Sequence, residues 1–315
     1  MQNNTSAARV AVIGELNVDL VATGLESLPV LGHESLATDF EITLGSASAI
    51  FACGIARLGH EVTFMSQVGA DEFGQFCLRT LRAAGVSTGK VLEDLTMKTG
   101  VTISVSTPED RALVTFLGAI SELEVGQLRL DDLAGHSHLH LTSYFLQHRL
   151  RPAFPTIMQE AKKYGLSTSF DPNSDPTSGW DKTIWDVIRE TDILFLNESE
   201  ALQLTRRHDA ADALKDLSEL AACVVIKRGP RGSVANLDGE TIFCDGFKVT
   251  PVDTTGAGDS FAAGFIHGFL EQKDLLTRLR FGNACGALST LKAGGTTNQP
   301  THFQLTDFLC RYDDR

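Results

Sequence analysis

The chain has 315 residues, of which 43% are hydrophobic and 21% are charged, which is the composition of an ordinary globular protein and excludes disordered and fibrous classes. Its 27 lysines and arginines face 40 aspartates and glutamates, and the net charge of −13 repels nucleic acid and anionic membranes. No apolar run approaches the roughly 18 residues that span a bilayer. We expect a cytoplasmic protein with a mobile tail at 1–8 and a single domain at 9–315.

Short apolar runs alternate with longer segments of helical periodicity. The apolar runs predict buried strands at Val10–Gly14, Val62–Met65, Leu139–Thr142, Leu166–Phe170, Ile193–Leu196 and Cys223–Lys227. The helical segments are 46–58, 72–84, 151–164, 198–206, 257–270 and 274–291. This order predicts an α/β fold in which a mainly parallel sheet is covered by helices on both faces.

Two segments, 16–44 and 98–118, alternate polar and apolar residues with period two and are too polar for a buried sheet. In the second, Val101, Ile103 and Val105 would face one side and Thr102, Ser104 and Ser106 the other, with a turn at 107–110. We expect a small β-sheet flap, or lid, over the main sheet; an ordinary surface hairpin is the alternative. The exposed edge of such a lid could pair with a second subunit in a homodimer.

The sequence DTTGAGDSFAAGF at 253–265 carries the strongest chemical signal. A helix that begins near Gly256 exposes its first N–H groups and favours an anion, while Gly256 and Gly258 leave room for phosphate oxygens. Asp259 would repel that phosphate, so its position makes sense if it orients a hydroxyl for phosphoryl transfer. The helix start itself should lower the pKa of Asp259.

This sequence closely resembles the C-terminal signature of the ribokinase-like family, the phosphofructokinase-B type sugar and nucleoside kinases. The resemblance implies an α/β/α sandwich with a lid, Asp259 as catalytic base, and the amides of Gly256, Ala257 and Gly258 as anion hole. GELNVDLV at 14–21 looks like the family's first strand and substrate-binding acid, which would be Asp19 with Asn17 beside it.

LGSASAIFACGIARLG at 44–59 is similar to the family's first signature, which usually opens with two glycines and carries a substrate-binding asparagine. Here Gly45 is retained and Ser46 replaces the second glycine, so both are expected at the substrate. Ile50 stands where the asparagine is expected. Because isoleucine cannot hydrogen-bond a hydroxyl, a furanose read through that position is disfavoured.

The same resemblance implies the nucleotide and ion sites. The NxxE motif would place Asn197 and Glu200 at the phosphates, with Glu200 acting through water on Mg²⁺; a plain helix cap at Asn197 is the alternative, and both roles can hold. VVIKRGPRGSVA would place Lys227, Gly229 and Gly232 near ATP, and Asn283 near the base. Residues at positions that surround a monovalent cation such as K⁺ in some relatives are Asp253, Thr255, Ser289, Gly294 and Asn298.

Other patterns are better explained by local structure than by a functional role. His136, His138 and His140 alternate along GHSHLHL. No cysteine or carboxylate stands out as a further ligand, so we do not predict a metal site there. Asp171 and Asp175 lie in DPNSDP, where turn chemistry explains them better than a hydrolase pair. The six cysteines show no CxxC spacing and are expected to be buried thiols.

The sequence therefore predicts an ATP- and Mg²⁺-dependent kinase that phosphorylates a hydroxyl of a sugar or sugar acid. A nucleoside kinase of the same family and a non-catalytic sugar or nucleotide sensor are the alternatives. A dinucleotide-dependent oxidoreductase is disfavoured, because GxGxxG does not follow the first strand.

Overall fold

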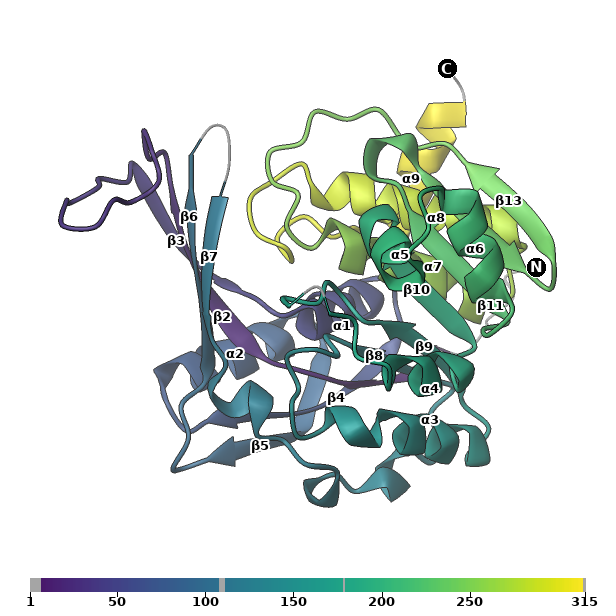
Figure 1. Ribbon diagram of the computed structural model, residues 1–315, viewed down its shortest axis with the longest axis horizontal. Helices are drawn as coiled ribbons and strands as arrows, with labels where there is room; N and C mark the ends of the chain where they lie inside the picture. Colours follow the sequence, from purple (N-terminus) through teal and green to yellow (C-terminus); the bar gives the residue numbers. More distant parts are fainter. Residues whose placement is uncertain (1–6, 108–110, 178, 314–315) are drawn as a thin grey trace.

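The structure is a computed structural model that describes residues 7–107, 111–177 and 179–313. Residues 1–6 of the expected tail and 108–110 of the expected turn lie outside the described residues. Within the described ranges the chain forms a large sheet between two helical layers and a separate small sheet that projects from one end (Figure 1). The predicted α/β/α architecture is confirmed.

The large sheet has nine strands in the order β13-β12-β11-β10-β9-β8-β1-β4-β5. Its strands β1 to β11 run parallel, and β12 and β13 are antiparallel at one edge. Their bounds are β1 (Arg9–Ile13), β4 (Glu61–Gly69), β5 (Val86–Asp94), β8 (His138–Thr142), β9 (Ser167–Asp171), β10 (Ile193–Asn197), β11 (Cys223–Lys227), β12 (Ser233–Leu237) and β13 (Glu240–Cys244). The sequence analysis found six of these and missed β5, β12 and β13.

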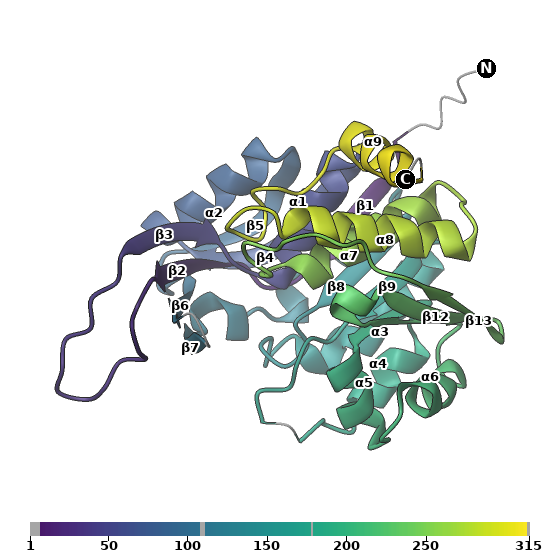
Figure 2. The ribbon, with the colours of Figure 1, turned by 90° about the horizontal axis from the view of Figure 1, so that it is seen from above.

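Helices cover both faces of this sheet, as Figure 2 shows from above. One layer contains α1 (Ala47–Arg57), α2 (Glu72–Ala83), α7 (Ala257–Leu270), α8 (Leu275–Ser289) and α9 (His302–Asp313); the other contains α3 (Phe154–Lys163), α4 (Ile184–Arg189), α5 (Glu198–Thr205) and α6 (Ala210–Ser218). Five short 3₁₀ turns lie at Gly118–Ser121, Val125–Gln127, Leu130–Leu133, Arg151–Ala153 and Gly229–Arg231. Each layer buries its own apolar core against one sheet face, which is why the parallel strands are apolar on both faces. Of these helices, α4, α6 and α9 were not predicted.

Helices α7 and α8 pack unusually closely. A Cβ at Gly264 would lie 2.6 Å from the carbonyl oxygen of Phe281, and one at Gly282 would lie 2.9 Å from the ring of Phe261. Both distances are too short for a side chain, so glycine allows each helix to approach the other's backbone and core rings. The helix that begins at Gly256 is therefore held firmly against its neighbour.

The small sheet has the order β3-β2-β6-β7 and comes from the two segments expected to form the lid. Its strands are β2 (Asn17–Thr23), β3 (Asp39–Leu44), β6 (Gly100–Ser106) and β7 (Arg111–Phe116). The register places apolar residues on one face, and this face is continuous from β3 to β7; its exposed members are Phe40, Ile42, Ile103, Val114 and Phe116. At the base of the sheet, β2 and β3 pack on α2.

All six cysteines are free thiols; five of them are buried, as expected, whereas Cys310 is exposed. Among the described helices, none is long and apolar enough to serve as a membrane span.

Candidate active site

The carboxyl ends of the central parallel strands bring polar residues together at one edge of the sheet. Asp171 ends β9, Asn197 ends β10 and Lys227 ends β11, where Asn197 and Lys227 are register partners. Glu15 lies just beyond the end of β1, and Ser143 just beyond β8. This edge is where ligands bind in parallel α/β sheets.

Helix α7 begins directly beside this edge. Gly256 is its N-cap residue and has a left-handed backbone (φ 71°), a conformation that glycine adopts without strain. Ala257 and Gly258 line a cavity of about 390 Å³, together with Lys227 and Phe261. Small residues of the first turn of α7 thus line this cavity, and the N–H of Ala257 donates to the carbonyl of Thr254 at 3.2 Å.

Lys227 joins the helix start to the sheet. Its Nζ lies 3.3 Å from the place that a Cβ of Gly258 would occupy, so the cation sits against the first turn of α7. The same Nζ donates to Asp171 Oδ2 in an ion pair that is almost wholly buried. Nearby carboxylates raise the pKa of Lys227 above its usual value against the effect of burial, which lowers it, so the side chain is a fixed positive charge.

Asp259 follows Gly258 on α7, and its pKa differs from the prediction. Burial raises its pKa to about 8, and the neighbouring carboxylates of Asp171, Glu15 and Glu200 add to this, while Lys227 opposes it. The prediction that the helix start would lower this pKa was wrong. A helix N-terminus contributes a fraction of a charge, and here burial, together with three acidic groups from distant parts of the chain, outweighs it.

Asn197 and Glu200 form a reciprocal cap at the start of α5. Asn197 Oδ1 accepts from the N–H of Glu200 at 2.9 Å, and Glu200 Oε2 accepts from the N–H of Asn197 at 2.7 Å. The second carboxylate oxygen accepts from Ser174 Oγ at 3.0 Å. Burial and the nearby Asp171 raise the pKa of Glu200.

The remaining walls of the 390 Å³ cavity contain the other predicted nucleotide residues. Gly229 and Gly232 line it from the turn after β11, and Asn283 lines it from α8. The amide of Asn283 donates to the carbonyls of Cys244 and Asp245 at 3.2 Å. Asn283 thereby fixes the segment after β13, and its amide nitrogen is occupied by backbone.

At the lid end, three predicted substrate residues meet. Asn17 Nδ2 donates to Asp19 Oδ1 at 2.9 Å and lies 3.3 Å from Thr102 Oγ1 on β6. An added Cβ at Gly45 would collide with Asp19 Oδ1 and lie 2.6 Å from Asn17 Nδ2. Gly45 is therefore glycine because two polar side chains occupy the space beside it.

Ser46 has a capping role. It starts α1 with φ 76°, its Oγ accepts from the N–H of Ala49 at 3.0 Å, and it donates to the carbonyl of Glu15 at 2.6 Å. The Glu15 carboxylate accepts from the hydroxyls of Ser48 and Ser143, the latter at 2.7 Å. Glu15 thus links the loop before the lid, the start of α1 and the end of β8. The sequence analysis gave Glu15 no role.

Ile50 packs against the turn that starts α7. It is 3% exposed, and a Cβ at Gly256 would lie 2.9 Å from its Cγ2, while one at Gly295 would lie 2.6 Å from its Cδ1. The isoleucine fills the space beneath the turn that starts α7. Position 50 therefore supports that turn by packing.

The residues expected around a monovalent cation come from two segments that meet. Asp253 accepts from the N–H of Thr255 and from the N–H of Gly294, both at 2.9 Å. Ser289 and Asn298 both donate to backbone carbonyls of α8, those of Gly286 and Leu288. Asp253, Thr255 and Gly294 are brought together, whereas the side chains of Ser289 and Asn298 hold the end of α8.

The structure also shows the surroundings of the histidines and aspartates to which the sequence assigned no functional role. His138 and His140 share Ser169 Oγ as a hydrogen-bond partner at 2.7 Å, and His136 bonds Thr63 at 3.0 Å. Asp175 accepts from Thr177 and Trp180 in a turn, as expected. Asp171 also accepts from the N–H of Asn173 in this turn, at 3.4 Å, but in addition it pairs with Lys227, which the sequence did not predict.

Comparison with known proteins places this geometry in a wider group. The family model for pfkB carbohydrate kinases matches residues 7–302. The 2-dehydro-3-deoxygluconokinase of Bacillus subtilis is 31% identical over 88% of this chain and 89% of its own length, and the ribokinase of Haemophilus influenzae is 28% identical over 95% and 98%. A protein of E. coli, provisionally called ribokinase II, was solved with ATP and Mg²⁺; it has a TM-score of 0.87 and 25% identity over 96% of this chain and 99% of its own.

Proposed function

Because the chain belongs to the pfkB family of carbohydrate kinases, we propose that it transfers the γ-phosphate of ATP to a hydroxyl group of a sugar or sugar acid. The observation that carries this proposal is the first turn of α7, where small residues at an enclosed cavity stand beside Lys227 and Asp259. A cation, helix-start amides and a carboxylate in one place suit phosphoryl transfer to an alcohol.

In this proposal the acceptor lies against Asn17, Asp19, Gly45 and Ser46. Its hydroxyl oxygen forms a bond to the γ-phosphorus, the bond from that phosphorus to the bridging oxygen of ADP breaks, and the hydroxyl proton passes to Asp259. A carboxylate whose pKa lies near 8 is a better proton acceptor than an ordinary aspartate once it is ionised. The amides of Gly256, Ala257 and Gly258 bind the negative oxygens of the transferred group.

The nucleotide would occupy the cavity between Lys227, Gly229, Gly232 and Asn283, whose lining is mainly small and apolar. Mg²⁺ would lie near Glu200 and act through water, where it neutralises phosphate charge. A K⁺ ion is proposed at the carbonyls of the segments that Asp253 joins.

A sugar acid is favoured within this class, because the relative that is 31% identical is named a 2-dehydro-3-deoxygluconokinase. A second cleft, of about 790 Å³, lies between β7 and the segments at 145–151 and 175–181, and Arg151 and His148 line it. Asp175 and Asp181 line the same cleft, and Arg151 lies 3.6 Å from Asp181, so an acceptor that carries a carboxylate would have to draw Arg151 away from this partner.

Turnover assays test this proposal directly. ADP release is measured with 2-dehydro-3-deoxygluconate, ribose, fructose and adenosine, with and without Mg²⁺. Turnover with a sugar or sugar acid supports the proposal, and turnover with adenosine alone would assign a nucleoside kinase. If the protein binds ATP but releases no ADP with any acceptor of a broader set, the sensor is favoured.

We also propose that the protein forms a homodimer through the apolar face of the lid. Ile103, Val114 and Phe116 are 46%, 66% and 54% exposed on this face, which is unusual for adjacent large apolar side chains. Sedimentation of the wild type and of Ile103→Lys tests this: the wild type should sediment as a dimer and the variant as a monomer. A monomeric wild type contradicts it.

A further inference from the structure

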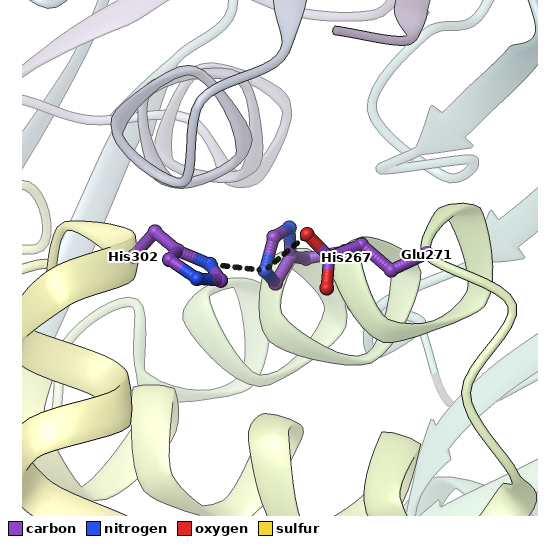
Figure 3. A group of neighbouring side chains, drawn as sticks. All are labelled: His267, Glu271 and His302. Atoms are coloured by element: carbon purple, nitrogen blue, oxygen red, sulfur yellow. Dashed lines mark hydrogen bonds and ion pairs between the residues drawn. The ribbon is translucent and has the colours of Figure 1, made fainter. Parts of the chain in front are cut away.

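Three histidines and a glutamate gather away from the active site, on the side of α7 that faces α9. His267 lies on α7, Glu271 follows it at the end of the helix, His302 starts α9, and His60 lies between α1 and β4. Figure 3 shows the side chains of His267, Glu271 and His302 converging from these two helices. None of these residues belongs to the proposed nucleotide or substrate sites.

The nitrogen atoms form a row with a carboxylate beside it. His267 Nδ1 lies 2.9 Å from His60 Nε2, and His267 Nε2 lies 2.9 Å from His302 Nδ1. Glu271 Oε1 is 3.7 Å from the same His267 Nε2. The other oxygen of Glu271 lies 3.5 Å from Lys273 Nζ, so Oε1 remains directed at the histidines.

We propose that His267, Glu271 and His302 form a binding site for one Zn²⁺-class transition-metal ion that joins α7 to α9. One ligand atom from each residue lies within 4.8 Å of the other two. In a tetrahedral zinc site with bonds of about 2.0–2.1 Å, ligand atoms are about 3.3 Å apart. The measured 2.9 Å and 3.7 Å lie on either side of this value, so small side-chain shifts suffice.

The ligand types indicate which ion fits. Two imidazoles and one carboxylate favour zinc and its neighbours over Mg²⁺ and Ca²⁺, which prefer oxygen ligands alone. The site is closed on one side by buried His267 and open on the other, where His302 is exposed. A water molecule can therefore complete the coordination, and the ion has a path from solvent.

The imidazole of His267 can bind a metal ion without first releasing a proton. Burial, followed by the neighbouring His60, His302 and Lys273, lowers the pKa of His267 to about 3. Burial also lowers the pKa of His60, although Glu271 opposes this. His267 is therefore neutral at pH 7, so a lone pair of its ring is available for the ion.

His60 would act on the metal through His267. When Nε2 of His267 binds the ion, its proton must sit on Nδ1, which then donates to His60 Nε2 at 2.9 Å. Such a second hydrogen bond orients a ligating histidine and strengthens it. His60 is thus a positioning residue, and metal binding should fix the tautomers of both rings.

Zinc titration of the untagged protein, after removal of metal with a chelator, tests the site. Isothermal titration should show one Zn²⁺ per chain, with affinity reduced at least about 100-fold in His302→Ala and about 10- to 100-fold in His60→Asn. His208→Ala, which removes another exposed histidine, is the control and should bind like the wild type. Zinc should raise Tm in the wild type and the control alone.

Glu271→Gln keeps the size of the side chain and is the second variant if His302→Ala fails to fold; it should bind at least about 10-fold more weakly. Co²⁺ gives an independent signal, because a low-coordinate cobalt site absorbs visible light strongly, and this absorption should be absent in the ligand variants. Absence of binding, or equal affinity in the wild type, His302→Ala and Glu271→Gln, overturns the proposal and leaves a hydrogen-bonded row of histidines.

Discussion

Asp259→Asn should make the ligand-free protein more stable while it abolishes most activity. The side chain keeps its shape and loses the negative charge that Asp171, Glu15 and Glu200 oppose. Turnover should fall about 10²–10⁴-fold, the usual contribution of a general base. A residue that served only to hold the fold would behave in the opposite way, losing stability when it is replaced.

The size and pH dependence of the gain follow from the raised pKa of Asp259. Because the folded pKa of about 8 exceeds the ordinary 3.8, the free energy of unfolding is highest below about pH 4, falls as pH rises from 4 to 8, and is constant above 8 as far as Asp259 is concerned. At 1.36 kcal/mol for each pH unit, the full penalty above pH 8 is about 6 kcal/mol. The same relation gives a penalty of about 3 kcal/mol at pH 6, so we expect the gain of Asp259→Asn at pH 6 to be about half of its gain at pH 9.

Urea unfolding followed by circular dichroism at pH 6 and pH 9, with a chelator and without ATP, measures both values. Asp274→Ala is the matched control, because Asp274 caps α8 by accepting from the N–H of Thr277 at 2.8 Å. Its loss should cost about 1 kcal/mol equally at both pH values. If Asp259→Asn is no more stable than the wild type at pH 9, or gains the same amount at both, the account of this acidic cluster is wrong.

Three further changes test other parts of the site. Lys227→Met leaves the Asp171 carboxylate buried without its cation, and should lower the free energy of unfolding by about 3–5 kcal/mol in urea titrations; an unchanged value would mean that solvent reaches Asp171. Gly45→Ala displaces Asp19 and should lower kcat/KM for the acceptor by about 10²-fold with Tm nearly unchanged; a normal kcat/KM would remove Asp19 from substrate binding. Ile50→Asn buries an unpaired amide and should lower the free energy of unfolding by about 1–3 kcal/mol without creating activity on ribose; gained ribose turnover would show that position 50 reaches the acceptor.

The central fold could be predicted from sequence because buried parallel strands are apolar on both faces, a pattern that few other structures share. The strands that were missed lie at the edges. β5 has a single neighbour and carries many exposed residues, so its sequence VSTGKVLED lacks that pattern. The β12–β13 hairpin did carry a signal, since Asp238-Gly239 between two short runs is typical of a tight turn.

The active site could be predicted in part, for a different reason. The glycines and Asp259 are consecutive, so their local pattern shows helix start and chemistry together. Asp171 and Glu15 join the site only through the order of the strands, which sequence spacing does not reveal. The pKa of Asp259 could not be predicted either, because it depends on burial in the folded chain and on carboxylates that are distant in sequence.

The close packing of α7 on α8 decides which half of the enzyme can move. The carbonyl of Phe281 and the ring of Phe261 fill the space beside Gly264 and Gly282, so we expect Asp259 to keep its position whether or not ligands are present. Asp19, in contrast, lies on a strand of the projecting sheet. We expect the acceptor to be carried toward a stationary acid, so crystals of different ligand states should superimpose on α7 and differ in the angle of the lid.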